Sequence, residues 1–119
     1  MALIPDESLP YFENMIYLPM VLIILERDRD TFEMGPFKLK RPYVKIVDEA
    51  MKIVRVELKK TTIYLRRNNM QVTRGKGDDT FTEYVFLYGG YEEHRRYLNV
   101  RLRNRTEELL TVYFAMTGS

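Results

Sequence analysis

The apolar positions in the first third of the chain follow the spacing of a helix. Phe12 and Ile16 lie four residues apart after Pro10, and proline is common in the first turn of a helix. Pro19 predicts a break, because proline lacks a backbone N–H and its ring clashes with the preceding turn. Residues 20–25 are apolar on every side, which indicates a buried helical turn or a buried strand.

A second apolar stripe predicts a helix from Tyr43 to about Lys60. Its residues recur at steps of three and four and are Tyr43, Val47, Ala50, Val54 and Leu58. The opposite side carries four bases, which are Lys45, Lys52, Arg55 and Lys59. A strand over residues 53–58 is the alternative, because apolar and charged residues alternate there.

From residue 62 onward the apolar period shortens to two, which predicts strands. Four strands are expected, over residues 62–66, 70–74, 81–88 and 97–103. Asn68 and Asn69 suit a tight turn between the first two strands, because asparagine tolerates a positive φ. Glycine-containing segments at residues 75–79 and 89–90 would end the second and third strands.

Asn104, with Glu107 three residues later, has the pattern of a capping box and predicts a final helix. The buried side of this helix would comprise Leu109, Leu110, Tyr113, Phe114 and Met116. An isolated meander buries too little apolar area to be stable, so helices should cover one of its faces. The sequence therefore predicts a single α+β domain over residues 1–119: a four-stranded antiparallel meander with N-terminal helices and a C-terminal helix packed on one face.

Composition removes several classes of chemistry. The chain has 119 residues, 45% of them hydrophobic and 30% charged, which favours one folded domain over a disordered chain. It has no cysteine, which excludes disulfides, thiolate zinc sites and cysteine nucleophiles. Its single histidine, His94, follows Glu93, and adjacent residues on a strand point to opposite faces rather than toward one metal ion. We expect no metal, no cofactor, no catalytic residues and no enzymatic activity.

The sequence also argues against a membrane span. Its longest apolar run, residues 16–25, is interrupted by Pro19, whereas a spanning helix needs about 20 apolar residues. The first 15 residues carry acids and no lysine or arginine, unlike the start of a signal peptide. We therefore expect a cytoplasmic protein without a membrane partner.

Charge is unevenly distributed along the chain. Residues 1–33 hold seven acids and two bases, whereas residues 34–119 hold 17 bases and ten acids. This asymmetry indicates an anionic partner for the basic part, or else pairing of the two parts within the fold.

The remaining candidate is a binding surface on the predicted sheet. If Leu98 and Leu102 face the core, then the alternate residues of that segment face outward. Charge identifies the open side of the outer strands; either side of the middle strand, residues 81–88, could be open, and we choose the side with Tyr84, Phe86 and Tyr88, which gives a platform of tyrosine, phenylalanine and arginine. Its residues would be Tyr64, Arg66, Tyr84, Phe86, Tyr88, Tyr97, Arg101 and Arg103.

Two functions fit such a platform. The first is a small interaction or adaptor module that self-associates or binds a protein partner, because exposed aromatic residues and arginine are typical of protein interfaces. The alternative is a single-stranded nucleic-acid-binding protein, in which the rings stack on bases and the guanidinium groups hold phosphates. In that alternative Lys45, Lys52, Arg55 and Lys59 would extend the phosphate track.

Overall fold

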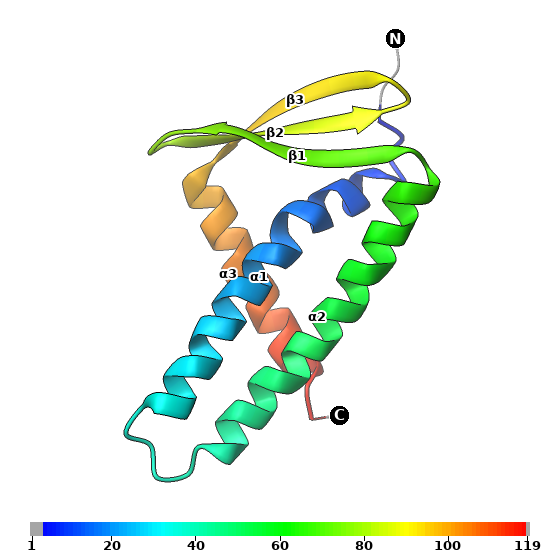
Figure 1. The fold of residues 1–119 in the computed structure, drawn as a ribbon. Helices are drawn as coiled ribbons and strands as arrows, with labels where there is room; N and C mark the ends of the chain where they lie inside the picture. The colour runs from blue at the N-terminus through cyan, green and yellow to red at the C-terminus, as the bar shows by residue number, and fades with distance from the viewer. Residues whose placement is uncertain (1–3, 119) are drawn as a thin grey trace.

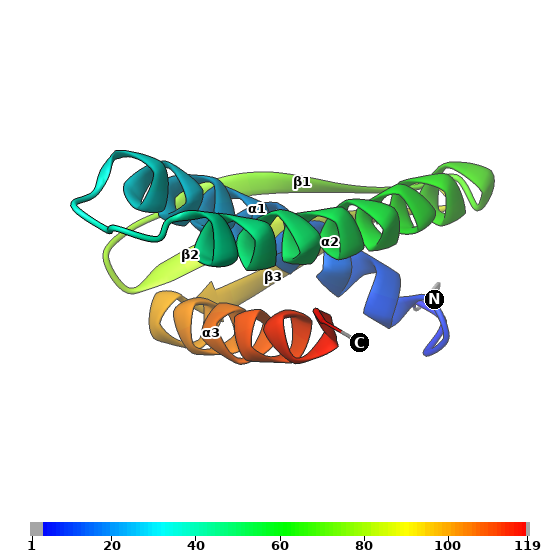
Figure 2. The ribbon, with the colours of Figure 1, turned by 90° about the horizontal axis from the view of Figure 1, so that it is seen from below.

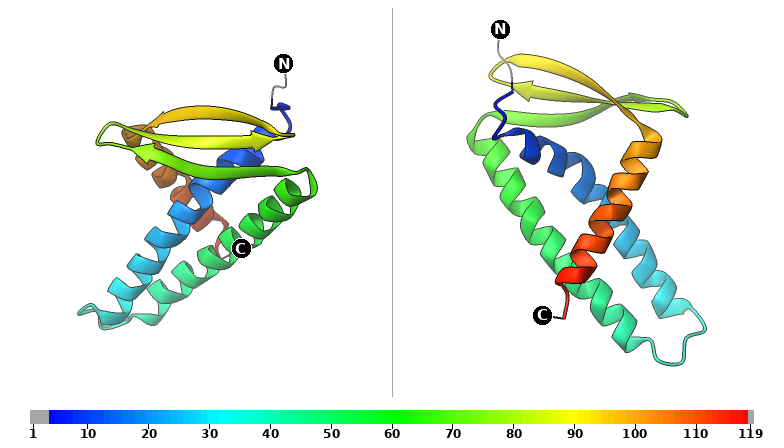
Figure 3. Two further views of the ribbon diagram at one scale, coloured as in Figure 1. Left: turned by 45° about the horizontal axis from the view of Figure 1, so that its top comes forward. Right: turned by 180° about the vertical axis from the view of Figure 1, so that it is seen from behind.

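The computed structural model describes residues 4–118 and combines three helices with one antiparallel sheet. The elements are α1 (Leu9–Met34), α2 (Arg41–Arg67), β1 (Met70–Gly77), β2 (Phe81–Tyr88), β3 (Tyr91–Leu98) and α3 (Asn99–Met116). The long helices α1 and α2 run antiparallel, and the sheet lies across one end of the pair (Figure 1). α3 leaves the sheet and crosses one face of the pair, as Figures 2 and 3 show. The class is α+β, but the sheet has three strands rather than the four expected.

α1 continues through Pro19, so the predicted break is wrong. A proline inside a helix removes one backbone hydrogen bond and costs about 3 kcal/mol. The residues on both sides of Pro19 offset this cost, because Leu18 and Val21 are fully buried against the other helices. Tertiary packing of an apolar helix therefore outweighs the local penalty.

Continuity through Pro19 also changes the membrane argument. α1 has 26 residues and contains an 18-residue window with a mean hydropathy of 1.3, so its length and composition would suffice to cross a membrane. The run of ten residues considered above therefore underestimates the apolar length of this segment. One third of that window is buried inside the fold, and the core helix of a folded protein passes the same test.

α2 confirms the predicted helix and rules out a strand at residues 53–58. The helix extends to Arg67, so the strand expected at residues 62–66 is wrong. Thr61 and Leu65 continue its buried stripe, and the Thr61 and Thr62 hydroxyls donate hydrogen bonds to the carbonyls of Glu57 and Leu58 within the same helix. Burial of this side overrides the strand preference of its β-branched residues.

The sheet has the order β1-β2-β3 and is antiparallel throughout. β2 matches the predicted strand, and β1 extends the expected 70–74 to Gly77. The expected strand at 97–103 is wrong, because β3 comprises Tyr91–Leu98 and pairs with all eight residues of β2. Gly89 and Gly90 have φ values of 54° and 84° and form the two-residue turn between these strands.

α3 begins at Asn99, five residues before the predicted start at Asn104. The side chain of Asn99 fixes this transition from strand to helix: its Nδ2 donates to the Asp78 carbonyl at 2.7 Å, and its Oδ1 accepts from Thr82 at 2.6 Å. Leu102 is buried whereas Leu98 and Val100 are exposed, so this segment does not present one alternating strand face.

The covered face of the sheet is the one that carries the aromatic residues of β2. Tyr84 and Phe86 are 7% and 0% exposed, and they join Phe12 and Ile16 of α1 in one apolar cluster. A second cluster fills the space between the three helices and includes Leu18, Val21, Leu25, Val47, Ala50, Met51, Val54 and Tyr113. α1 contributes to both clusters and lies at the centre of the fold.

This packing predicts a large difference in stability between substitutions on the two faces of β2. Phe86→Ala removes a fully buried ring that stacks on Phe12 and is expected to lower the free energy of unfolding by about 3–5 kcal/mol. Val85→Ala, on the opposite face, is expected to cost about 1 kcal/mol. Urea unfolding followed by circular dichroism measures both. Equal losses would contradict the assignment of the covered face.

Candidate functional site: an arginine groove

The predicted platform does not exist as an open surface. Tyr84 and Phe86 point into the core, and Tyr88 and Tyr97 are half-buried against the same cluster. The other four residues lie on helices, with Tyr64 and Arg66 on α2 and Arg101 and Arg103 on α3. The error follows from the two strands that were wrongly expected and from the choice of face for β2.

Tyr64 has a packing role at the end of α2. Its ring stacks on Tyr11 with centroids 3.6 Å apart and planes 8° from parallel. Its hydroxyl forms a hydrogen bond of 2.8 Å with the Ser8 hydroxyl. Both ring and hydroxyl therefore hold the start of α1 against α2 and are not free to stack on a ligand.

The structure brings Tyr97 and Arg101 together in a groove that the sequence did not predict. The groove lies between α1, the β3 edge of the sheet and the start of α3, and has a volume of about 530 Å³. Its lining comprises Glu13, Tyr17, Phe81, Arg95, Arg96, Tyr97, Leu98 and Arg101. A second hollow of about 410 Å³ continues it along α3, sharing three of these residues and adding Asn104, Arg105 and Glu108. We call these two connected hollows the arginine groove.

The guanidinium groups of the groove differ in their partners. Arg96 lies 4.1 Å from the centre of the Phe81 ring, which holds the planar group in a cation–π contact. Arg95 forms an ion pair with Glu93 and lies over the Phe86 ring. Among residues 4–118, neither Arg96 nor Arg101 has a carboxylate within ion-pair distance. These two arginines can therefore bind an external anion without breaking an internal pair.

Two tyrosines supply neutral hydrogen-bond donors beside the arginines. Burial raises the pKa of Tyr17, and the nearby Arg101 and Arg105 only partly oppose this effect. Burial also raises the pKa of Tyr97, against the opposing effect of Arg95. Both phenols keep their protons at neutral pH and can donate a hydrogen bond to an anion in the groove.

The basic side of α2 forms a separate surface. Lys45, Lys52 and Lys59 are exposed, lie seven residues apart, and are followed at the same step by Arg66. Seven residues turn a helix almost twice, so these bases share one side at intervals of about 10 Å. Arg55, the fourth member of the predicted phosphate track, is paired with Glu26 at 3.8 Å. The sequence therefore correctly predicts that these bases share one side of the helix.

His94 lies on the outer face of β3, between two glutamates. Its Nδ1 is 2.8 Å from Glu83 and its Nε2 is 3.2 Å from Glu92. Hydrogen bonding to Glu83, and secondly to Glu92, raises the pKa of His94 above 6.5. Within residues 4–118, no three histidine or acidic side chains are arranged to hold a metal ion.

The arginine groove depends on residues that sequence reasoning missed. Tyr17 was assigned no role, and Arg95 and Arg96 lie in a strand that was not predicted. The sequence does contain a signal for this groove: two consecutive arginines precede Tyr97, and Arg101 follows Tyr97 by four residues. It was missed because the charged segment 92–96 lacks the apolar alternation by which strands are recognised.

The fold and the groove define a small α+β protein in which a helical hairpin supports a three-stranded meander and a cationic groove opens beside the edge strand. The chain belongs to the YhjD protein family, whose model matches residues 3–118. It is 36% identical over 108 residues to a protein of Bacillus subtilis (strain 168) named "Uncharacterized protein YhjD", with 91% of this chain and 90% of the relative covered. No solved structure matches the chain.

The geometry around His94 predicts its titration. The pKa of the imidazole is expected above 6.5 in the folded protein, and Glu83→Gln is expected to lower it more than Glu92→Gln does, because the Glu83 contact is the larger cause. The chain has one histidine, so its ring protons can be followed by NMR against pH without ambiguity.

The raised pKa of His94 also determines how the stability of the fold changes with pH. Because the folded pKa is raised, the paired, protonated histidine stabilises the fold below the unfolded pKa, and this contribution disappears as the pH rises through the folded value. His94→Gln should remove this dependence between slightly acidic and neutral pH. A folded-state pKa at or below 6.5 would contradict the pairing.

Proposed function

We propose that this chain is a small non-enzymatic binding module whose arginine groove takes an acidic segment of a protein partner. The observation that carries the proposal is that two guanidinium groups without an ion-pair partner within the described residues 4–118, those of Arg96 and Arg101, line one groove. Such groups bind carboxylates strongly, because the planar guanidinium matches both oxygens of the anion.

The other walls of the groove support a peptide as the ligand. Phe81 and Leu98 provide apolar surface beside Arg96, which suits an apolar side chain next to an acidic one. Glu13 and Glu108 also line the groove, so an anion is favoured only near the arginines; spaced carboxylates can meet that condition, whereas a continuous run of phosphates would also meet the two glutamates. A segment with alternating carboxylates and apolar residues therefore fits better than a nucleic-acid backbone.

The placement of titratable groups supports a non-catalytic role. General acid–base catalysis works best with a group whose pKa lies near the working pH, most often histidine. His94 is the only histidine of the sequence and does not line the groove. The phenols of Tyr17 and Tyr97 have raised pKa values and act in the proposal as hydrogen-bond donors only.

Single-stranded nucleic-acid binding is the second candidate, and the row of bases on α2 favours it. Lys45, Lys52 and Lys59 present positive charge along one side of the helix, as a phosphate backbone requires. The aromatic part of that hypothesis has lost its support, because Tyr64 is stacked on Tyr11 and the β2 rings are buried. This candidate now depends on charge alone.

Substitution of a groove arginine tests the first proposal. The probe is a fluorescein-labelled decapeptide in which glutamates alternate with leucines, and its fluorescence anisotropy is measured at low and at moderate salt. Arg101→Ala should weaken binding by about tenfold or more, because a hydrogen bond to a charged group contributes about 1.5–3 kcal/mol. Arg103→Ala, an equal charge change on the same helix outside the groove, should have little effect.

The nucleic-acid candidate predicts a different pattern. A labelled oligothymidylate should then bind more tightly than the peptide, with Lys52→Ala and Lys59→Ala weakening it and Arg101→Ala leaving it unchanged. Equal weakening of the peptide by Arg101→Ala and Arg103→Ala would indicate a general charge effect and would overturn the groove proposal. Absence of peptide binding at low salt would also overturn it.

A further inference from the structure

The loop between α1 and α2 presents strongly exposed apolar side chains at the end of the molecule farthest from the sheet (Figures 1 and 3). Met34 is 87% exposed and Leu39 is 75% exposed, more than any other large hydrophobic side chain in the described part of the chain. The molecule is elongated, with extents of 58 × 32 × 18 Å, so the sheet does not cover this end. We call residues 34–45 the hairpin tip.

Contacts within the loop and its flanking helices hold the hairpin tip in one conformation. Phe32, Phe37 and Tyr43 form a group of three rings with centroids 5.3–5.9 Å apart. The backbone N–H of Gly35 donates to the Thr31 carbonyl at 2.8 Å, and a Cβ at Gly35 would lie 2.7 Å from the Phe37 ring. Aromatic packing therefore stabilises the conformation of the loop, and the side chains of Met34 and Leu39 are not part of this group of rings.

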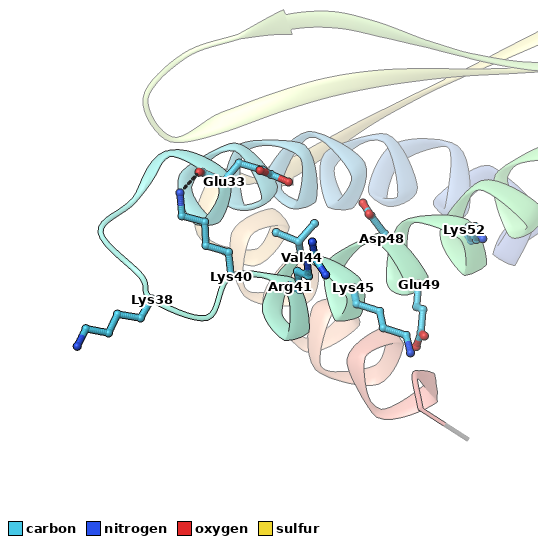
Figure 4. Close-up of a pocket in the computed structure, with 9 residues that line it drawn as sticks. All are labelled: Glu33, Lys38, Lys40, Arg41, Val44, Lys45, Asp48, Glu49 and Lys52. Atoms are coloured by element: carbon cyan, nitrogen blue, oxygen red, sulfur yellow. Dashed lines mark hydrogen bonds between the residues drawn. The ribbon is translucent and has the colours of Figure 1, made fainter.

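The charge of the hairpin tip has a single sign. Residues 34–47 contain four bases, Lys38, Lys40, Arg41 and Lys45, and no acid. Lys40 donates to the Glu33 carbonyl at 2.6 Å, whereas Lys38 extends away from both helices (Figure 4). Within the part of the chain that the structure describes, Lys38, Arg41 and Lys45 form no ion pair. These three bases line a hollow of about 700 Å³ at the hairpin tip. Its other charged lining residues are Lys40, Lys52 and the acids Glu33, Asp48 and Glu49 (Figure 4).

We infer that the hairpin tip docks on the surface of an anionic lipid bilayer. Met34 and Leu39 enter the boundary between headgroups and acyl chains, and Lys38, Arg41 and Lys45 contact the lipid phosphates. Exposed apolar residues flanked by bases bind such surfaces through apolar burial and attraction to anionic lipids together. Tyr43 is of a residue type enriched at this depth, and Phe37 is of a type common on the apolar side of interfacial segments.

A bilayer fits the hairpin tip better than a folded protein does. The apolar side chains project from the loop instead of lining an apolar groove, and a fluid surface accepts such projections without shape complementarity. The sequence led us to expect no membrane partner, and this inference departs from that expectation, which rested on the absence of a spanning run and of a signal peptide; contact with a membrane surface requires neither. The inference is independent of the arginine groove, which lies beside the sheet at the other end of α1.

Vesicle co-sedimentation of the full chain tests the inference. The probes are vesicles of phosphatidylcholine alone and vesicles with 30% phosphatidylglycerol. Wild-type protein should sediment with the anionic vesicles and much less with the neutral ones. Met34→Ser combined with Leu39→Ser should reduce binding to the anionic vesicles by about tenfold or more, because both apolar anchors are lost. Lys38→Gln combined with Lys45→Gln should weaken binding by a similar factor and reduce its dependence on the anionic lipid.

Two matched controls make the result specific. Ile23→Ser removes a half-exposed apolar side chain of α1 outside the hairpin tip and should leave sedimentation unchanged. Arg101→Ala should also sediment like wild type, which separates this inference from the proposed function. Circular dichroism checks that every variant is folded, which is the expected result for substitutions of exposed residues.

Three outcomes would overturn the inference. The first is wild-type protein that does not sediment with anionic vesicles. The second is unchanged sedimentation of the Met34→Ser, Leu39→Ser variant. The third is equal loss in Ile23→Ser, which would assign membrane contact to the side of α1. A fourth result would assign the hairpin tip to an acidic protein instead. In that case the vesicles do not bind the protein, whereas polyglutamate beads retain the wild type and do not retain the Lys38→Gln, Lys45→Gln variant.

Discussion

The Phe12 ring of α1 lies against the Phe86 ring of β2 with centroids 4.8 Å apart, and both side chains are fully buried. This contact fixes which face of the sheet is covered. It also fixes the position of α1, whose next turns supply Leu18, Val21 and Leu25 to the core between the helices. Because one helix serves both cores, the sheet and the α1–α2 hairpin cannot be separated into independent parts. The position of the arginine groove follows, since Tyr17 of α1 lines it together with residues of β3.

The sequence predicted those elements whose apolar pattern agrees with their packing. α2 was recognised because its buried side repeats at helical spacing, and β2 because its aromatic and β-branched residues occupy a whole strand. The segment 62–66 was misread because its residues favour strands, while burial of Thr61 and Leu65 keeps it helical. β3 was missed because an edge strand can consist mostly of charged residues and depend on pairing with its neighbour.

The candidate surface could be predicted only in part, for a related reason. An alternating pattern shows that a strand has two faces, but β2 has apolar residues on both of them, so its sequence does not show which one the helices cover. Tyr97 and Arg101 are in the groove because β3 passes directly into α3, and that junction depends on hydrogen bonds between Asn99 and residues 78 and 82. Such long-range contacts leave no periodic signal in the sequence.

The uneven charge along the chain is partly neutralised by ion pairs within the fold and partly left unpaired on the surface. Some of it is neutralised within the fold, because Glu26 of α1 pairs with Arg55 of α2, so the acidic and basic segments of the sequence meet across the helical hairpin. Bases without an ion-pair partner within residues 4–118 remain beside the sheet (Arg96, Arg101), at the hairpin tip (Lys38, Arg41) and along α2 (Lys52, Lys59). An exposed ion pair such as that of Glu26 and Arg55 contributes little to stability, whereas unpaired exposed bases create a positive potential that attracts anions. The two proposed contacts use opposite ends of an elongated molecule, so a substitution at one end is expected to leave the contact at the other end intact.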